Sequence, residues 1–337
     1  MRKSIITLLF LFCTVQIFAQ NDIEEYVVEG IQYHDNGNYK KAIESYKKAL
    51  VLSPKSQLVN YEISLSYFSK GDYKKAIEHS DIVLKQKDKY LLEAYISKGS
   101  ALDVLGETKA SIKVFKKAIR KTGGHYLLYY NLGLTYYKLG ELEKVEENLI
   151  KAIEDNERHA SSHFMLAMLH EQMGNSIQSL LATHYFLFLE PNSSRSKIGY
   201  QMLQDNFGGN VTTDVNKPNT INITLSPSDD TQFGAVEMMV SMYAATRFLD
   251  ENDGKTDDEI FVEHTELFFE TLGELKEDKN KEIWWTFYTP FFYDLAKSDH
   301  LEAYCKKITQ SENENSSKWL VENEDKVTDF ENWVENK

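Results

Sequence analysis

The chain has 337 residues, of which 42% are hydrophobic and 27% are charged, and this composition is typical of a globular protein with about two domains. Acidic residues outnumber basic ones by 52 to 38, so the formal net charge is -14 at pH 7. A surplus of this size repels the phosphates of nucleic acids and of anionic lipids, and we therefore expect no nucleic-acid partner. The chain contains only 5 prolines and 16 glycines, and these low numbers favour a helical fold.

Residues 1–19 have the pattern of an export signal. Arg2 and Lys3 precede an apolar run from Ile5 to Phe18, and Ala19 supplies a small residue at which a signal peptidase could cut. The run is too short for a comfortable membrane span, and no other segment is apolar enough to cross a bilayer. We expect a signal peptide cleaved near Ala19 and a mature protein that is not an integral membrane protein.

The cleavage site also bears on compartment and redox state. The Ala19–Gln20 junction resembles that of exported proteins of Bacteroidota, and this resemblance implies a periplasmic location. Cleavage there removes Cys13 and leaves Cys305 as the one cysteine of the mature chain. No internal disulfide is then expected, even in an oxidising compartment.

A period of about 34 residues organises residues 20–191. Glycines recur at intervals of 34, 35, 34 and 34 residues: Gly37, Gly71, Gly106, Gly140 and Gly174. A small residue stands seven positions before each of them: Gly30, Ser64, Gly99, Gly133 and Ala167. Two antiparallel helices approach closely only where side chains are small. Each period therefore predicts a pair of helices, with the recurring glycine ending the first helix in a left-handed conformation.

Two segments carry a family resemblance. Gly37-Asn38-Tyr39-Lys40-Lys41-Ala42-Ile43 and Gly71-Asp72-Tyr73-Lys74-Lys75-Ala76-Ile77 closely resemble the tetratricopeptide repeat (TPR) family. The resemblance covers about residues 23–191 and implies five helix pairs stacked into an α-solenoid. Residues 192–208 then read as a capping helix over the last apolar face.

The second half has a different pattern. Residues 209–228 read as a linker with one strand over Ile221–Leu225, where apolar and polar residues alternate. Residues 229–337 read as a helical, aromatic-rich C-terminal domain, so the expected fold class is all-α. Thr256 and Glu259 form a capping box. Further helices are expected over 299–309 and 317–333, and Pro290 is expected to interrupt an aromatic block. All four tryptophans lie beyond residue 280, so we expect a separate aromatic core.

Residues that could carry chemistry have simpler structural interpretations. His159, His163 and His170 could share a helix face, but the last two occupy positions where the repeats place core aromatics. The acidic segment 250–261 resembles a calcium loop, yet its glycine is fifth and not sixth. Cys305 is interpreted as a buried thiol. We therefore expect no metal, no cofactor and no enzymatic activity.

The resemblance implies that the first helix of each pair lines a concave groove. The groove positions are largely apolar: Val27, Ile31, Tyr61, Leu65, Phe68, Ile96, Tyr130, Leu134, Tyr137, Phe164 and Met168, with His34, Ser100, Asp103 and Glu171 among them. Family members that grip a terminal carboxylate use basic and amide side chains there, and this set contains no Lys, Arg or Asn. The groove is therefore predicted to bind a protein or peptide partner through an amphipathic helix or an extended apolar segment.

Several alternatives remain open from the sequence. The groove residues could pack only between helices, or the second half of the chain could fill the groove. Aromatic rings such as Tyr61, Tyr130 and Phe164 could stack on sugars in a glycan-binding envelope protein. An enzyme housed in the C-terminal domain would need Asp294, His264 or His300 to meet in one pocket.

Overall fold

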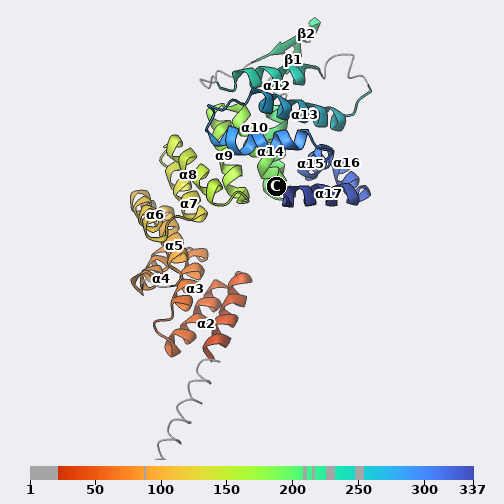
Figure 1. Ribbon diagram of the computed structural model, residues 1–337. Helices are drawn as coiled ribbons and strands as arrows, with labels where there is room; N and C mark the ends of the chain where they lie inside the picture. The colour runs from red at the N-terminus through yellow and green to blue at the C-terminus, as the bar shows by residue number, and fades with distance from the viewer. Residues whose placement is uncertain (1–21, 87–88, 208–210, 215–216, 225–231, 247–253) are drawn as a thin grey trace, which may run out of the picture. The chain divides into compact units, whose positions relative to one another are not determined.

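The computed structural model describes residues 22–86, 89–207, 211–214, 217–224, 232–246 and 254–337 (Figure 1). Nearly all of the described chain is helical, as predicted. It divides between Asp155 and Asn156 into two compact units. None of the described helices is both long and apolar enough to cross a bilayer.

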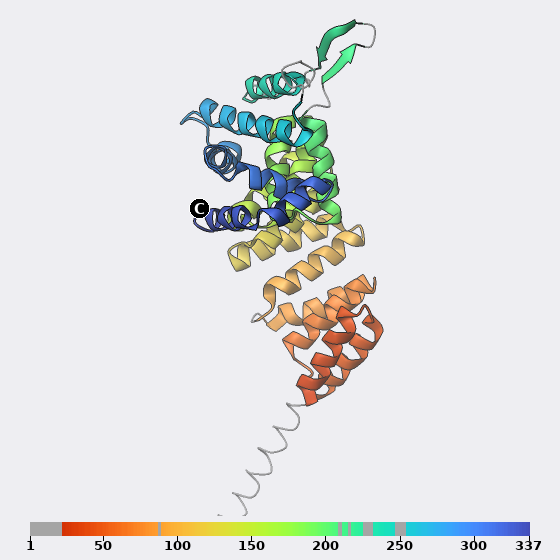
Figure 2. The ribbon, with the colours of Figure 1, turned by 90° about the vertical axis from the view of Figure 1, so that its right-hand side faces the viewer.

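The first unit is a stack of helix pairs. Its elements are helical residues 22–35, α2 (Tyr39–Leu52), α3 (Gln57–Ser69), α4 (Tyr73–Gln86), α5 (Leu91–Val104), α6 (Thr108–Thr122), α7 (Tyr126–Tyr137) and α8 (Leu142–Asp155). Figure 2 shows each helix lying beside the next along the stack. This is the paired arrangement that the 34-residue period predicts.

Small residues make the close approach within each pair possible. The ring of Tyr46 on α2 lies against Gly30, and the ring of Phe115 on α6 lies against Gly99. In the second pair, serines replace the glycine and the ring, and Ser64 Oγ lies 2.8 Å from Ser80 Oγ. The glycines that end the first helices have positive φ, for example +72° at Gly37. The predicted left-handed helix ends are confirmed.

The second unit begins with the fifth helix pair. Its elements are α9 (Ala160–Met173), α10 (Ser176–Leu189), α11 (Ser194–Asn206), β1 (Val211–Asp214), β2 (Lys217–Ile223), α12 (Gly234–Thr246), α13 (Asp257–Leu275), the π-helix η2 (Trp284–Tyr288), α14 (Thr289–Ala296), α15 (Leu301–Thr309), α16 (Glu314–Glu322) and α17 (Glu324–Glu335). The capping box predicted at Thr256 and Glu259 starts α13.

Helix α10 is the centre of the second unit. Twelve of its 14 residues are buried, and these include the polar residues Gln178, Ser179, Thr183 and His184 as well as a largely apolar remainder. The fifth pair and the C-terminal helices therefore share one aromatic core, and the prediction of a separate core for the C-terminal domain was wrong. His163 Nδ1 of α9 lies 2.7 Å from the hydroxyl of Tyr288, and Phe188 of α10 packs against Phe291, with ring centroids 5.6 Å apart.

Three local predictions for the second half need correction. The linker holds two antiparallel strands and not one, since Val211 pairs with Ile223. Pro290 does not break the aromatic block into separate helices, because η2 continues directly into α14 and Pro290 lies in the first turn of α14. The single helix expected over 317–333 is in fact two helices, α16 and α17. Asn323 lies between them as the C-cap of α16 and the N-cap of α17.

Candidate functional site

The predicted groove positions of the first unit differ in accessibility. Val27 is only 7% exposed and lies in the core beside Tyr46, so it is not available as a contact residue. Ile31 and Tyr137 are 36% and 38% exposed. The remaining positions are half-buried. We call the following set the inner wall: Ile31, Tyr61, Leu65, Phe68, Ile96, Tyr130, Leu134 and Tyr137.

Tyr61 is held in place by stacking. Its ring lies parallel to that of Tyr90, with centroids 5.7 Å apart and planes 15° apart. Tyr90 has a φ of +58°, the one positive value among described residues other than glycine. Burial, together with Glu62 and Glu93, raises the pKa of Tyr61 to about 12. Tyr61 therefore offers a neutral, rigid aromatic surface with one face already covered.

Phe68 contributes to packing as well as to the inner wall. Its ring meets that of Tyr73 on α4 edge to face, with centroids 5.3 Å apart. It also packs against the core cluster that contains Tyr67 and Ile63. A substitution at Phe68 would therefore disturb the fold as well as any partner contact.

Polar side chains among the inner-wall residues bond to one another across neighbouring repeats. His34 Nδ1 lies 2.8 Å from Ser66 Oγ, and the hydroxyl of Ser100 donates to Asn131 Oδ1 at 3.3 Å. The ammonium of Lys138 lies 2.6 Å from Asp103 Oδ2. These contacts pair the polar groups with one another, although Asp103 Oδ1 is buried without a hydrogen-bond partner and the Lys138 side chain is 49% exposed. The apolar side chains therefore share the accessible surface with Lys138.

Asn131 and Lys138 supply an amide and a basic group at this surface, and neither is among the groove residues predicted from the sequence. Each follows a residue that was selected, Tyr130 and Tyr137, so a wider choice of repeat positions would have found them. Their side chains are bonded to Ser100 and Asp103, as described above. Asn131 and Lys138 are therefore already engaged and do not form a free pair with which to grip a terminal carboxylate.

The two predicted groove residues of the second unit have contrasting environments. Phe164 packs on Phe186 of α10, with ring centroids 4.6 Å apart, and the Arg195 guanidinium lies 5.5 Å from its ring centre. Met168 is 41% exposed. The neighbouring carboxylate of Glu171 accepts hydrogen bonds from Ser179 and Asn206. Met168 is therefore the accessible member of this pair.

The histidine and cysteine residues that were considered for metal binding or catalysis make structural contacts. Both ring nitrogens of His163 are used, Nδ1 with Tyr288 and Nε2 with the carbonyl of Glu157 at 2.9 Å. Cys305 is buried as predicted, and burial raises the pKa of its thiol. In the part of the chain that the structure describes, no three His, Cys, Asp or Glu side chains come together to hold a metal. Most of the acidic segment 250–261 considered for calcium lies outside the described residues.

The three residues considered for an enzyme have separate neighbours. Asp294 accepts from the ammonium of Lys337, and His264 Nε2 lies 3.3 Å from the hydroxyl of Thr246. The ring of His300 packs near Trp333, with centroids 5.7 Å apart. Each residue has its own structural contact, and these contacts give no catalytic arrangement.

The second unit also contains a cavity of about 1340 Å³ that the sequence did not indicate. Tyr200, Phe261 and the first turn of α13 contribute to its lining. Two of its charged groups are paired, since Lys306 Nζ lies 2.6 Å from Asp258 Oδ2, and Asn313 donates to the other oxygen at 2.6 Å. This network links α13 to α15 through Lys306 and to the segment between α15 and α16 through Asn313.

Comparisons with known proteins agree with the repeat pattern. A family model described as TPR repeat matches residues 30–71, and one described as Tetratricopeptide repeat matches residues 92–120 and 126–157. The chain therefore contains tetratricopeptide repeats, and it has the helical solenoid fold that such repeats form. Repeats of this kind typically mediate protein–protein interaction.

Individual relatives share only part of the chain. A TPR repeat-containing protein of Methanocaldococcus jannaschii is 27% identical over 125 residues, which are 37% of this chain and 22% of that protein. The chain thus matches less than a quarter of that relative's length.

Solved structures of repeat proteins are also similar. A thermophilic TPR protein of Thermus thermophilus is 21% identical with a TM-score of 0.47, and the match covers 54% of this chain and 99% of that one. A crystal structure of MamA is 26% identical with a TM-score of 0.41, covering 48% and 94%. PilF of Pseudomonas aeruginosa is 17% identical with a TM-score of 0.48, covering 56% and 88%.

Proposed function

We propose that this protein is an exported, non-enzymatic scaffold that binds a protein or peptide partner on its inner wall. The observation that carries the proposal is the set of apolar inner-wall side chains, of which Ile31 and Tyr137 are exposed and the others half-buried, set among polar groups that bond to one another. An apolar surface of this kind favours a partner that brings its own apolar face, such as an amphipathic helix or an extended apolar segment.

Rigidity of the inner wall supports the same role. Tyr61 is fixed by its stack with Tyr90, and Phe68 by its contact with Tyr73. A surface whose side chains are already ordered loses less conformational entropy when a partner binds. The inner wall is therefore suited to recognition without rearrangement.

A glycan ligand has weaker support. Stacking on a sugar needs an uncovered ring face, and Tyr90 covers one face of Tyr61. The ring of Phe164 lies against Phe186 and Arg195. Two of the three rings considered for sugar binding are thus partly occupied by the chain itself.

The export part of the proposal depends on residues 1–19. The basic start, the apolar run and Ala19 support cleavage and release into a periplasm. N-terminal sequencing of the protein recovered from its source cells tests this. A mature chain that begins at Gln20 supports export, whereas an intact Met1 in the cytoplasmic fraction contradicts it.

Partner binding is tested by comparing two double variants in crosslinked pull-downs from source cells. Ile31→Glu with Tyr137→Glu places two charges on the inner wall at its most exposed positions. Val51→Glu with Ile82→Glu places the same charges on exposed apolar residues of the second helices α2 and α4. The proposal expects the first variant to lose its crosslinked partners and the second to keep them, with equal helicity by circular dichroism. Equal capture by both variants would exclude the inner wall.

A further inference from the structure

Helix α6 has an unusual concentration of positive charge. It contains five lysines, one arginine and no acidic residue, although the whole chain has a net charge of -14. All six cations are exposed: Lys109, Lys113, Lys116, Lys117, Arg120 and Lys121. The helix buries its opposite face through Ser111, Phe115 and Ala118. The net charge of the sequence therefore hides a strongly basic local surface.

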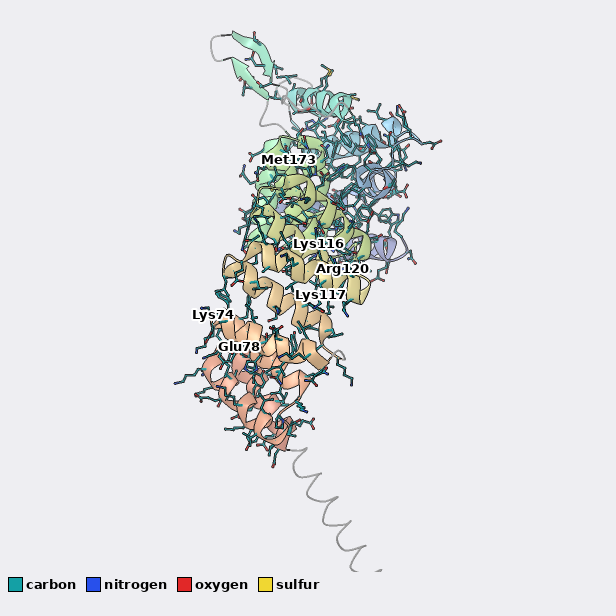
Figure 3. The ribbon with its side chains drawn as sticks, turned by 90° about the vertical axis from the view of Figure 1, so that its left-hand side faces the viewer. Lys74, Glu78, Lys116, Lys117, Arg120 and Met173 are labelled. Atoms are coloured by element: carbon teal, nitrogen blue, oxygen red, sulfur yellow. The ribbon has the colours of Figure 1, made fainter. Side chains whose placement is uncertain are left out.

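The cations form a continuous row. Lys109, Lys113 and Lys117 are four residues apart and Arg120 follows three residues later, so they share one face of the helix. At a rise of 1.5 Å per residue the row is about 17 Å long. Figure 3 shows Lys116, Lys117 and Arg120 side by side on one face of the first unit. We call these six residues the α6 basic row.

Neighbouring acidic groups offset only a small part of this charge: Glu147 on α8 interacts electrostatically with Lys116 of the row as well as with Lys151. Asp81 on α4 pairs with Lys98 at 2.6 Å, and Glu147 on α8 pairs with Lys151 at 2.6 Å. Within the described ranges, no ion pair joins a cation of the α6 basic row to an acid. Like charges three and four residues apart destabilise a helix, and an external anionic partner would relieve that repulsion.

The composition of the row indicates which kind of anion it suits. None of the large apolar side chains that the described chain exposes lies on α6, so the row lacks the anchor that a specific peptide would need. It has no exposed aromatic ring for stacking on bases and only one arginine for reading them. Lysine is a hydrated point charge on a flexible stem, which suits a layer of many like anions without fixed geometry.

We propose that the α6 basic row docks this protein on a membrane surface rich in anionic lipid headgroups. The acidic remainder of the chain does not prevent this, because charges more than about 8 Å from the lipid are largely screened at physiological salt. Each lysine or arginine near such a surface adds to the attraction, and the five lysines and one arginine of this helix fall within the cluster size of about four to eight that is typical of binding to anionic lipids. This surface is separate from the inner wall.

The test measures partitioning of residues 20–337 onto sedimenting vesicles. One set contains phosphatidylcholine alone, and the other contains phosphatidylcholine with an equal amount of phosphatidylglycerol. A quadruple variant changes Lys109, Lys113, Lys117 and Arg120 to glutamine, and it leaves Lys116 in place because that ammonium lies over the Tyr136 ring. A matched control changes four exposed lysines of the second unit to glutamine: Lys276, Lys279, Lys281 and Lys318.

Wild-type protein should bind only the anionic vesicles, and more weakly as salt rises. The α6 variant should lower the partition coefficient on the order of 100-fold, while the control, with the same change in net charge, stays within about threefold of wild type. Circular dichroism checks that both variants fold. The variant Ile31→Glu with Tyr137→Glu leaves the α6 basic row intact and should bind vesicles as the wild type does. The experiment can therefore contradict the membrane proposal without contradicting the partner proposal, and the reverse.

Four results would overturn the proposal. Wild-type protein could ignore anionic vesicles, or the two quadruple variants could lose binding equally. Sodium phosphate could compete better than sodium chloride at equal ionic strength, which would indicate a site for a discrete phosphate. Polyglutamate or DNA could bind the row under conditions in which vesicles do not, which would indicate a different class of partner.

Discussion

His184 on α10 and Tyr304 on α15 are joined by a buried hydrogen bond of 2.9 Å between Nδ1 and Oη, although 120 residues separate them in sequence. The Tyr304 hydroxyl also lies 3.3 Å from the carbonyl oxygen of His184. A hydroxyl that donates to this carbonyl and accepts from Nδ1–H satisfies both contacts. Together with the contact between His163 and Tyr288, this bond fastens the fifth repeat to the C-terminal helices.

Replacing Tyr304 with phenylalanine should therefore destabilise the second unit. The change leaves the His184 ring nitrogen buried without its partner, at a cost of about 1–3 kcal/mol. All four tryptophans lie in this unit, so their fluorescence during urea unfolding measures the effect. Tyr73→Phe, at a half-exposed position in the first unit, should leave this transition unchanged. A transition unaltered by Tyr304→Phe would show that the hydrogen bond contributes nothing.

Stability of the second unit should fall with acid because of two buried histidines. Burial lowers the pKa of His163 and of His184 to about 3, whereas an unfolded chain protonates histidine near pH 6.5. The stabilisation is thus complete above about pH 6.5 and is lost as the pH falls toward 3. Between pH 6 and pH 5, each histidine should reduce the free energy of unfolding by about 1 kcal/mol.

A His184→Leu variant separates this effect from ordinary destabilisation. Its stability at neutral pH is expected to be lower, but the loss between pH 6 and pH 5 should be smaller than in the wild type by about 1 kcal/mol, since His163 and His159, whose pKa values burial also lowers, remain. The measurement is urea unfolding followed by tryptophan fluorescence at each pH. A slope equal to that of wild type would mean that His184 does not carry the pH dependence.

Two glycines at the same repeat position should respond oppositely to alanine. A Cβ at Gly99 would overlap the ring of Phe115, and we expect a loss of about 1–3 kcal/mol from overpacking. A Cβ at Gly133 would lie 3.6 Å from Leu149, which is ordinary contact. Gly133→Ala should then be neutral or stabilising by up to about 1 kcal/mol through helix propensity. Thermal unfolding followed by circular dichroism compares the stability of the two variants. Equal losses of stability would contradict the packing described for these helix pairs.

Cys305 should be inert in the folded protein. Its side chain is buried and burial raises the pKa of its thiol, so little reactive thiolate forms at neutral pH. Ellman's reagent should label the residues 20–337 protein only after denaturant is added. Rapid labelling without denaturant would show that α15 opens to solvent.

The repeat architecture could be read from sequence because it depends on local and periodic requirements. Small residues such as Gly30 and Gly99 must recur where helices touch, and glycines such as Gly37 must end the first helices with positive φ. The capping box at Thr256 is equally local. Each of these features requires a particular residue type at a fixed spacing, and that requirement is visible in one sequence.

The packing around α10 was not predictable in the same way. The contacts of His163 and His184 with Tyr288 and Tyr304 join segments more than 100 residues apart, and no local pattern encodes them. The largely apolar sequence of α10, which carries no charged residue, was the available signal, since such a helix is usually covered on every side. Val27 was misassigned because a repeat position alone does not reveal how much of a side chain its neighbours cover.

The central claim is that apolar side chains of the inner wall bind a partner. Once a partner is isolated, its dissociation constant for residues 20–337 can be measured by calorimetry alongside both double variants. Charges at Ile31 and Tyr137 should weaken binding by about 30-fold or more, because each must be desolvated against an apolar face, whereas charges at Val51 and Ile82 should change it by less than about threefold. Unchanged affinity in the first variant, or an equal loss in the second, would contradict the account.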